Sequence, residues 1–179
     1  RDLKPANLFL TARSDGTPCV KVLDFGISKH TGGTSSGMAM TKTTAVMGSP
    51  LYMSPEQMAS SRNVDARSDI WALGAIMYEL LIGHPPFTGE TLPQVCAAII
   101  QNEPESLRAK RPEIPEALEL AILKCLKKNR EERFQNIAEL AVAITPFGPP
   151  RASHSAERIF RVLSASGIAP TSPQATGEP

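Results

Sequence analysis

The sequence predicts a mainly α-helical domain that carries one small β-hairpin near its N-terminus. The first observation is a stretch at 68–83 whose only charged side chains are Asp69 and Glu79. The second is a series of apolar residues at helical spacing between 91 and 145, and the third is a pair of short strand-like segments before residue 24. With 179 residues, of which 41% are hydrophobic, the chain is long enough for one domain with a real core.

The composition limits the classes of partner and setting. A net charge of +1 favours neither nucleic acid nor an anionic membrane as a bulk partner. Cys19, Cys96 and Cys125 lack metal-ligand spacing and are typical of reduced thiols, so a cytoplasmic setting is expected. The 68–83 stretch is too short to cross the ~30 Å core of a bilayer, which favours a buried helix over a re-entrant or interfacial membrane segment.

The first elements expected along the chain form a hairpin. Segments 7–10 and 20–23 have the composition of short strands, and the turn cluster at 14–18 joins them. Polar residues lie directly before the first strand and directly after the second. We therefore expect the polar groups at the two ends of this hairpin to lie close together.

The 68–83 stretch is expected to be the central helix. Ser68 is a suitable N-cap, and Gly83 followed by Pro85-Pro86 ends the helix. Because the stretch is apolar almost all round, we expect it to be buried on every side. Asp69 is compatible with the simple preference of acids for the first turn, or with a role in holding another backbone segment through N–H bonds.

Three more helices are expected, the first capped by Thr91 and the second beginning at Pro115. Their inward residues are expected to be Leu92, Val95, Cys96, Ile99 and Ile100 in the first, Leu118, Ile122, Cys125 and Leu126 in the second, and Ile137, Leu140, Ala141 and Ile144 in the third. From 146 to 179 the composition shifts to Pro, Ala, Ser, Gly and Thr, which predicts a disordered linker with one transient helix around 159–163.

Two motifs flank the expected hairpin. Residues 1–7 read R-D-L-K-P-A-N, and V-K-V-L-D-F-G follows at 20–26. This pair resembles the protein-kinase family, whose catalytic loop is H-R-D-L-x-x-x-N with D-F-G about a hairpin later. The His would precede residue 1. The resemblance covers about 1–145 and implies the C-terminal lobe of a bacterial-type serine/threonine kinase, with the small hairpin at its catalytic loop.

The resemblance assigns chemical roles to four residues. Asp2 would accept or orient the proton of the substrate hydroxyl, and Lys4 would lie near the transferred phosphoryl group. Asn7 and Asp24 would hold the Mg²⁺ ions that bridge the phosphates of ATP. A lysine two residues after the catalytic Asp resembles serine/threonine rather than tyrosine kinases, although Lys4 is also compatible with a solvated loop lysine.

The resemblance also implies an activation segment at 24–56 and a helical core at 65–145. Arg1 would pair with a phosphorylated residue of the activation segment. The candidate phosphorylation sites are Thr41, Thr43 and Thr44, with Thr41 and Thr43 favoured. Ser49 stands where the family has a hydroxyl that bonds the catalytic Asp and Lys.

Three further residues are implied to be structural. Ser54-Pro55-Glu56 stands where the family has A-P-E, and Glu56 would pair with Arg133. Asp69 would accept backbone N–H bonds from the catalytic loop around Arg1. The usual Asp-Pro before the paired arginine is Asn129-Arg130 here, so the turn at that point is expected to differ.

The residues and the resemblance together are compatible with two functions of different class. The first is the catalytic lobe of a kinase that transfers the γ-phosphate of ATP to Ser and Thr hydroxyls of a protein substrate. The second is a non-catalytic, kinase-like module that binds or regulates a partner. The chain opens without Met inside a motif and lacks the Gly-rich loop and strand lysine. We therefore expect a piece of a longer polypeptide, inactive without its N-terminal lobe, with a membrane tether or sensor domain possible beyond residue 179.

Overall fold

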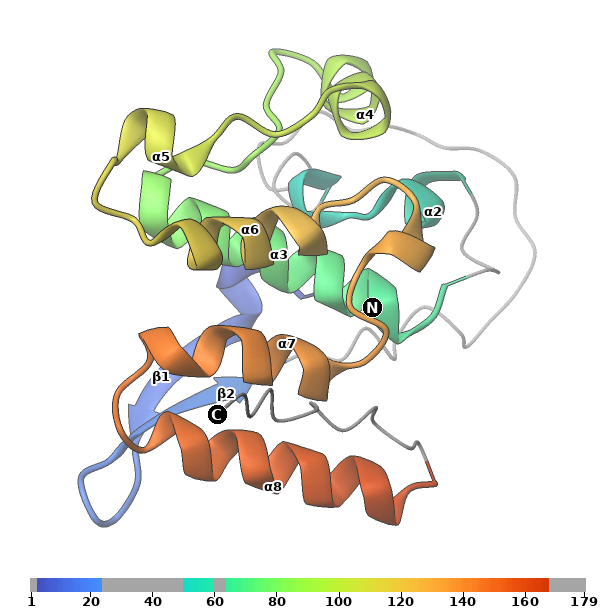
Figure 1. Cartoon of the computed structure of the whole chain (residues 1–179). Helices are drawn as coiled ribbons and strands as arrows, with labels where there is room; N and C mark the ends of the chain where they lie inside the picture. Colours follow the sequence, from blue (N-terminus) through green and yellow to red (C-terminus); the bar gives the residue numbers. More distant parts are fainter. Residues whose placement is uncertain (1–2, 24–49, 60–63, 168–179) are drawn as a thin grey trace, which may run out of the picture.

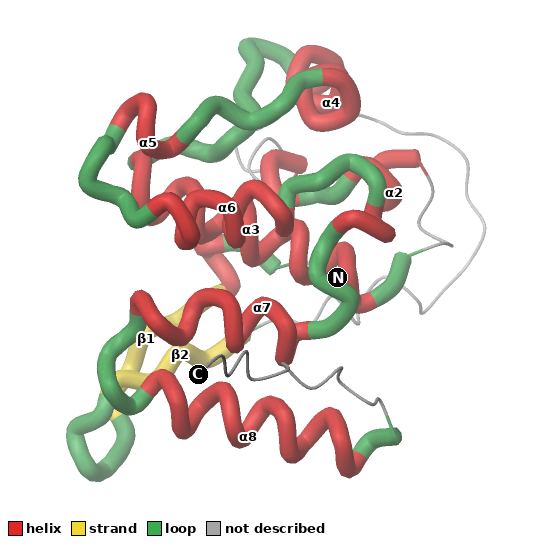
Figure 2. The backbone as a smooth tube through the Cα atoms, in the orientation of Figure 1, coloured by secondary structure: helices red, strands yellow, loops and turns green. Residues whose placement is uncertain are grey.

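The computed structural model describes residues 3–23, 50–59 and 64–167. Within these ranges it is mainly helical and contains one two-stranded antiparallel sheet (Figures 1 and 2). The elements are η1 (Pro5–Asn7), β1 (Leu8–Ala12), β2 (Pro18–Val22), η3 (Pro50–Tyr52), α2 (Pro55–Ala59), α3 (Ala66–Ile82), α4 (Leu92–Gln101), α5 (Leu107–Lys110), α6 (Glu116–Cys125), η5 (Arg130–Glu132), α7 (Ile137–Ile144), η6 (Thr145–Phe147) and α8 (Ala152–Ala165). This confirms the predicted fold class.

Helix α3 is the central element of the helical part, because it packs against α6, η3 and α5 (Figure 1). Trp71, Ala75 and Tyr78 on this helix have no exposed surface. The expectation that α3 is buried on every side is wrong, however, because Leu80 is 78% exposed. An apolar run in the sequence identifies a core helix, but it does not reveal where the neighbouring elements end.

The N-terminus of α3 also differs from the prediction. Asp65, and not Ser68, is the N-cap, and its carboxylate accepts a 2.8 Å hydrogen bond from the backbone N–H of Arg67. Ser68 lies inside the first turn. Asp and Ser are similarly good caps, so local preference does not distinguish them. At the other end, Gly83 adopts a left-handed conformation with φ of 94° and ends the helix as predicted.

Helices α3 and α6 approach each other closely at Gly74. A Cβ atom at this position would lie 2.5 Å from the Cβ of Cys125 and 3.4 Å from the Leu126 side chain. Both partners are fully buried, so neither can move without disturbing the core. Glycine at position 74 therefore permits the helix contact, despite its low helix propensity.

We expect Gly74→Ala to lower the free energy of unfolding by about 1–3 kcal/mol, because overpacking outweighs the better helix propensity of alanine. Urea denaturation measures the effect. In a Cys125→Gly background the same substitution should cost clearly less, since the clashing Cβ is gone. Equal costs in the two backgrounds would show that the clash is not the cause.

The remaining helices begin and end close to their predicted bounds. Thr91 and Gln94 form a capping box at the start of α4, which confirms the predicted cap. Val95 and Ile99 are buried as expected, but Ile100 is 52% exposed, which corrects its assignment to the inward face. Ile100 lies about 100° around the helix from Ile99, so the two cannot share a narrow buried stripe.

The chain after Pro146 contains a long helix. Helix α8 packs against α7 and η6 (Figure 1), where the sequence predicts only a transient helix within a linker. Its half-buried face consists of Ala152, Ala156, Ile159, Phe160 and Leu163, whereas Val162 is 60% exposed. Among the described helices, none is long and apolar enough to span a membrane.

Candidate functional site

The predicted site residues fall into two groups. Lys4, Asn7, Glu56, Asp69 and Arg133 belong to the described parts of the chain. The others lie outside the described residues, namely Arg1, Asp2, Asp24, Thr41, Thr43, Thr44 and Ser49. The structure therefore shows the parts of the molecule that flank this second group in the sequence.

The hairpin joins the two ends of the predicted catalytic site. The strands pair in a register that sets Leu8 opposite Val22. One step further, the carbonyl oxygen of Asn7 accepts a 2.9 Å hydrogen bond from the backbone N–H of Leu23. Asp24 follows Leu23 directly in the sequence. The predicted catalytic loop and the segment that leads into D-F-G are therefore hydrogen-bonded to each other at this point.

The loop before β1 is a short 3-10 turn. Pro5 occupies its first position, where the missing N–H and the restricted φ are both tolerated. The backbone N–H of Asn7 donates to the carbonyl of Lys4 at 2.9 Å and closes the turn. Both Lys4 and Asn7 are half-buried. Proline and the turn together restrict the backbone between two residues that the resemblance places at the nucleotide.

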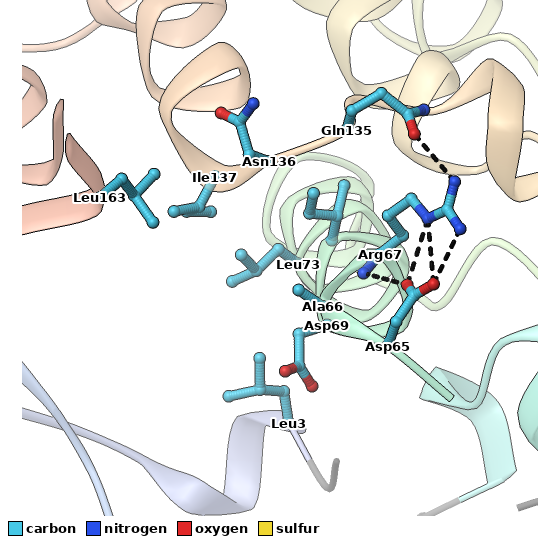
Figure 3. A pocket seen from close by; sticks show the side chains of 11 residues that line it. Leu3, Asp65, Ala66, Arg67, Asp69, Leu73, Gln135, Asn136, Ile137 and Leu163 are labelled. Carbon is cyan, nitrogen blue, oxygen red and sulfur yellow. Dashed lines mark hydrogen bonds and ion pairs between the residues drawn. The ribbon is translucent and has the colours of Figure 1, made fainter. Parts of the chain in front are cut away.

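Asp69 faces the same loop from the core helix. An open, mainly apolar cavity of about 530 Å³ has both Asp69 of α3 and Leu3 of the loop in its wall, and Figure 3 shows the side chains that line it. Leu73, Ile137 and Leu163 complete its apolar lining from α3, α7 and α8. An acid in the first turn of α3 is therefore next to the segment that carries the R-D-L motif, although the two are far apart in the sequence.

The end of the predicted activation segment is held by an ion pair. Arg133 Nη1 and Nη2 donate to the two carboxylate oxygens of Glu56, each at 2.8 Å. Ser68 Oγ donates to the same carboxylate at 2.6 Å. The sequence predicts the pairing of Glu56 with Arg133, but it does not indicate Ser68, whose only sequence signal was its suitability as a cap.

The Arg133 side chain is fully buried, and all of its N–H groups have acceptors. Besides the two bonds to Glu56, it donates to the backbone carbonyls of Lys127, Arg67 and Lys128 at 2.8, 3.1 and 3.2 Å. Arg133 thus ties Glu56, at the end of the predicted activation segment, to α3 and to the turn after α6. In that turn, the Asn129 side chain caps η5 in place of the usual Asp.

The Glu56 carboxyl is strongly biased towards its charged form. Burial alone would raise its pKa, but hydrogen bonds from Arg133 and Ser68 outweigh burial and lower the pKa to about 2. A carboxyl whose pKa is lower in the folded than in the unfolded state stabilises the fold. Its contribution is fully present at pH values above the pKa of the unfolded state, and it is lost as the pH falls to the pKa of the folded state.

We therefore expect part of the folding free energy, on the order of 3 kcal/mol, to be lost as the pH falls from about 4.5 to about 2. Urea denaturation at a series of pH values measures this slope. A Glu56→Gln variant should be less stable at neutral pH and should show a shallower decline over the same range. An unchanged slope in the variant would assign the acid sensitivity to other carboxyls.

Two polar contacts of the core were not predicted. Tyr52 Oη donates a 2.6 Å hydrogen bond to Glu79, the lone carboxylate within the apolar part of α3, and thereby links η3 to the core helix. Lys128 Nζ donates to the Ile99 carbonyl at 2.7 Å and lies 3.9 Å from the centre of the Phe87 ring. The isolated charge of Glu79 in an apolar helix was the one sequence signal for either contact.

Comparisons with known proteins agree with this framework. Residues 1–143 match the family model described as protein kinase domain. The chain is 39% identical over 173 residues to the serine/threonine-protein kinase PknB of Mycobacterium tuberculosis, an alignment that covers 93% of this chain and 26% of that protein. It is 38% identical over 177 residues to the serine/threonine-protein kinase Pkn1 of Myxococcus xanthus, with 97% of this chain and 25% of that protein covered.

The chain thus spans about a quarter of the length of these relatives. A third relative, PknB of Mycobacterium leprae, is 41% identical over 140 residues, or 78% of this chain and 21% of that protein. The family match includes the hairpin, the Glu56–Arg133 pair and the helices through most of α7. The chain therefore belongs to the protein kinase family, and its relatives are named serine/threonine-protein kinases.

Proposed function

We propose that the intact protein is a serine/threonine protein kinase and that this chain is its C-terminal lobe. In this proposal it transfers the γ-phosphate of ATP to Ser and Thr hydroxyls of protein substrates. The observation that carries the proposal is the hairpin between R-D-L-K-P-A-N and D-F-G. Its register bonds Asn7 to Leu23, the residue before Asp24, which supports a shared site for the two motifs.

Magnesium and ATP fit the donor groups of this site. Asn7 offers an amide oxygen and Asp24 a carboxylate, both hard oxygen ligands of the kind that Mg²⁺ prefers. Magnesium is typically held by one or two carboxylates together with substrate phosphates. When bound, the metal would neutralise phosphate charge.

The remaining loop residues would position the substrate. Phosphoryl transfer depends mainly on alignment and charge stabilisation, so few covalent roles are needed. Asp2 would orient the acceptor hydroxyl and take its proton, and Lys4 would supply positive charge near the transferred group. Ser49 would hydrogen-bond Asp2 and Lys4. The short turn that links Lys4 and Asn7 supports a restrained loop.

Regulation would act on the activation segment. A phosphate on Thr41, Thr43 or Thr44 adds roughly −1.5 to −2 charges, which Arg1 could bind through its planar guanidinium. The far end of the segment is held by the ion pair of Glu56 with Arg133. Such a lobe would work on the cytoplasmic side, where ATP is available, with its N-terminal lobe as an obligate partner.

The test is phosphoryl transfer by the intact protein. With Mg-ATP and a protein acceptor, phosphoserine or phosphothreonine should accumulate, as measured by mass spectrometry, and chelation of Mg²⁺ should abolish the transfer. Peptides of the 27–49 segment should carry phosphate on threonine after the same incubation. Absence of any transfer by a folded, intact protein would favour the alternative, a kinase-like module that binds or regulates a partner.

A further inference from the structure

Helix α8 has few of the contacts that hold the other long helices in place. It packs against α7 and η6, but none of its residues is buried, and its inward face is only half-buried. Within the described part of the chain, no side chain of α8 forms a hydrogen bond or an ion pair with another element. Apolar packing is therefore the main interaction between α8 and the rest of the fold.

The start of α8 is also weakly held. Arg151 occupies its N-cap position and makes no capping hydrogen bond through its side chain, whereas α3, α4 and α7 are each capped by a side chain. A missing cap typically costs a helix about 1 kcal/mol. The Gly-Pro-Pro segment at 148–150 leads into the helix, and its two prolines have no backbone N–H to donate to η6.

The composition of α8 suits a helix that forms only while it is docked. Ile159, Phe160 and Leu163 lie on the half-buried face, while Arg158 and Arg161 are exposed to solvent. An isolated helix of 14 residues is marginal in water, so α8 would unfold once it left the surface of α7. Docking and helix formation are therefore coupled, and both depend on a small number of apolar contacts.

Leu163 connects α8 to the cavity next to the predicted catalytic loop. Figure 3 shows its side chain pointing from α8 into this cavity, which is also lined by Leu73 and Ile137 of the core. Asp69 and Leu3 belong to the same wall. Helix α8 thus supplies one part of the cavity wall, and the cavity would lose that part if the helix were released.

We propose that α8 is a detachable helix, which leaves α7 and unfolds as a unit while the remaining helical core stays folded. Its release would remove the Leu163 part of the wall and so open the cavity further. Local opening of this kind is expected where an element has few buried contacts. The family match ends at residue 143, before α8 begins, so the core left behind would keep all matched residues. The proposal concerns conformation and does not depend on phosphoryl transfer.

Hydrogen exchange of the full 179-residue chain, followed by mass spectrometry, tests the proposal. In the unchanged protein, the peptide that covers α8 should exchange at least about 100-fold faster than the peptide that covers α3, because α8 opens without unfolding of the core. Equally slow exchange of the two helices would overturn the proposal, since α8 would then open only together with the core.

A release variant and a matched control locate the contacts. The release variant carries Phe160→Gln and Leu163→Gln, which remove two apolar side chains from the half-buried face. Exchange in α8 should become about tenfold faster or more, while α3 stays protected. The control carries Arg161→Gln and Val162→Gln, at exposed positions of the same helix, and should change the exchange of α8 less than about threefold.

Two outcomes of this comparison would overturn the proposal. Loss of protection in α3 together with α8 in the release variant would show that α8 is an integral part of the core. Equal acceleration of α8 exchange in the release variant and in the control would show that the half-buried face does not hold the helix.

Discussion

Replacing Asp2 by Asn in the intact protein should lower kcat for phosphoryl transfer by about 10²–10⁴-fold, because the amide can no longer accept the proton of the substrate hydroxyl. The KM for ATP should change little, since Asp2 is not a proposed metal ligand. Steady-state kinetics with a protein acceptor measures both quantities. A lower kcat with an unchanged KM would indicate that the general base is lost, whereas a misfolded lobe would impair both quantities.

Asp24→Ala should abolish nearly all transfer and should also weaken Mg-ATP binding, because it removes a proposed ligand of the metal. Asp15→Asn provides the matched control, since Asp15 lies in the turn of the same hairpin and accepts its hydrogen bonds from Thr17 in that turn. That variant should keep full activity. Full activity in Asp2→Asn or in Asp24→Ala would reject the role assigned to the residue.

The second large effect is expected at the buried ion pair. Arg133→Met should lower the free energy of unfolding by about 3–5 kcal/mol, because Glu56 would keep its charge in a largely buried position without its partner. The three backbone carbonyls of Lys127, Arg67 and Lys128 would also lose their donor. Urea denaturation, followed by the fluorescence of the single tryptophan, measures the loss.

Two further variants test the cause. In the double variant Glu56→Met with Arg133→Met no charge is left unpaired, so the protein should recover part of the stability lost in Arg133→Met. Arg130→Met, at a partly exposed position three residues earlier, should cost less than about 1 kcal/mol. A double variant no more stable than Arg133→Met would show that the stranded carboxylate is not the main cause of the loss.

The hairpin, the central helix and the family were predictable because their signals are local. Strand pairing around a Gly-Pro turn sets a register, and R-D-L-K-P-A-N and D-F-G occupy fixed distances from that turn. The helix at 68–83 was recognisable from its apolar run. The same signals could not locate the cap at Asp65 or the exposure of Leu80, since capping preferences are nearly equal and exposure depends on distant neighbours.

Taken alone, the sequence determined the fold class, the family and the order of the chemical groups along the chain, because each follows from composition, spacing or motif. Apart from the Glu56–Arg133 pair, which the family resemblance implied, only the tertiary structure decided which groups meet across long separations. It brought Tyr52 to Glu79, joined Ser68 to Glu56, and packed α8 against α7. Such contacts arise when side chains that are buried together must find hydrogen-bond partners and cover apolar surface, and no local pattern encodes that requirement.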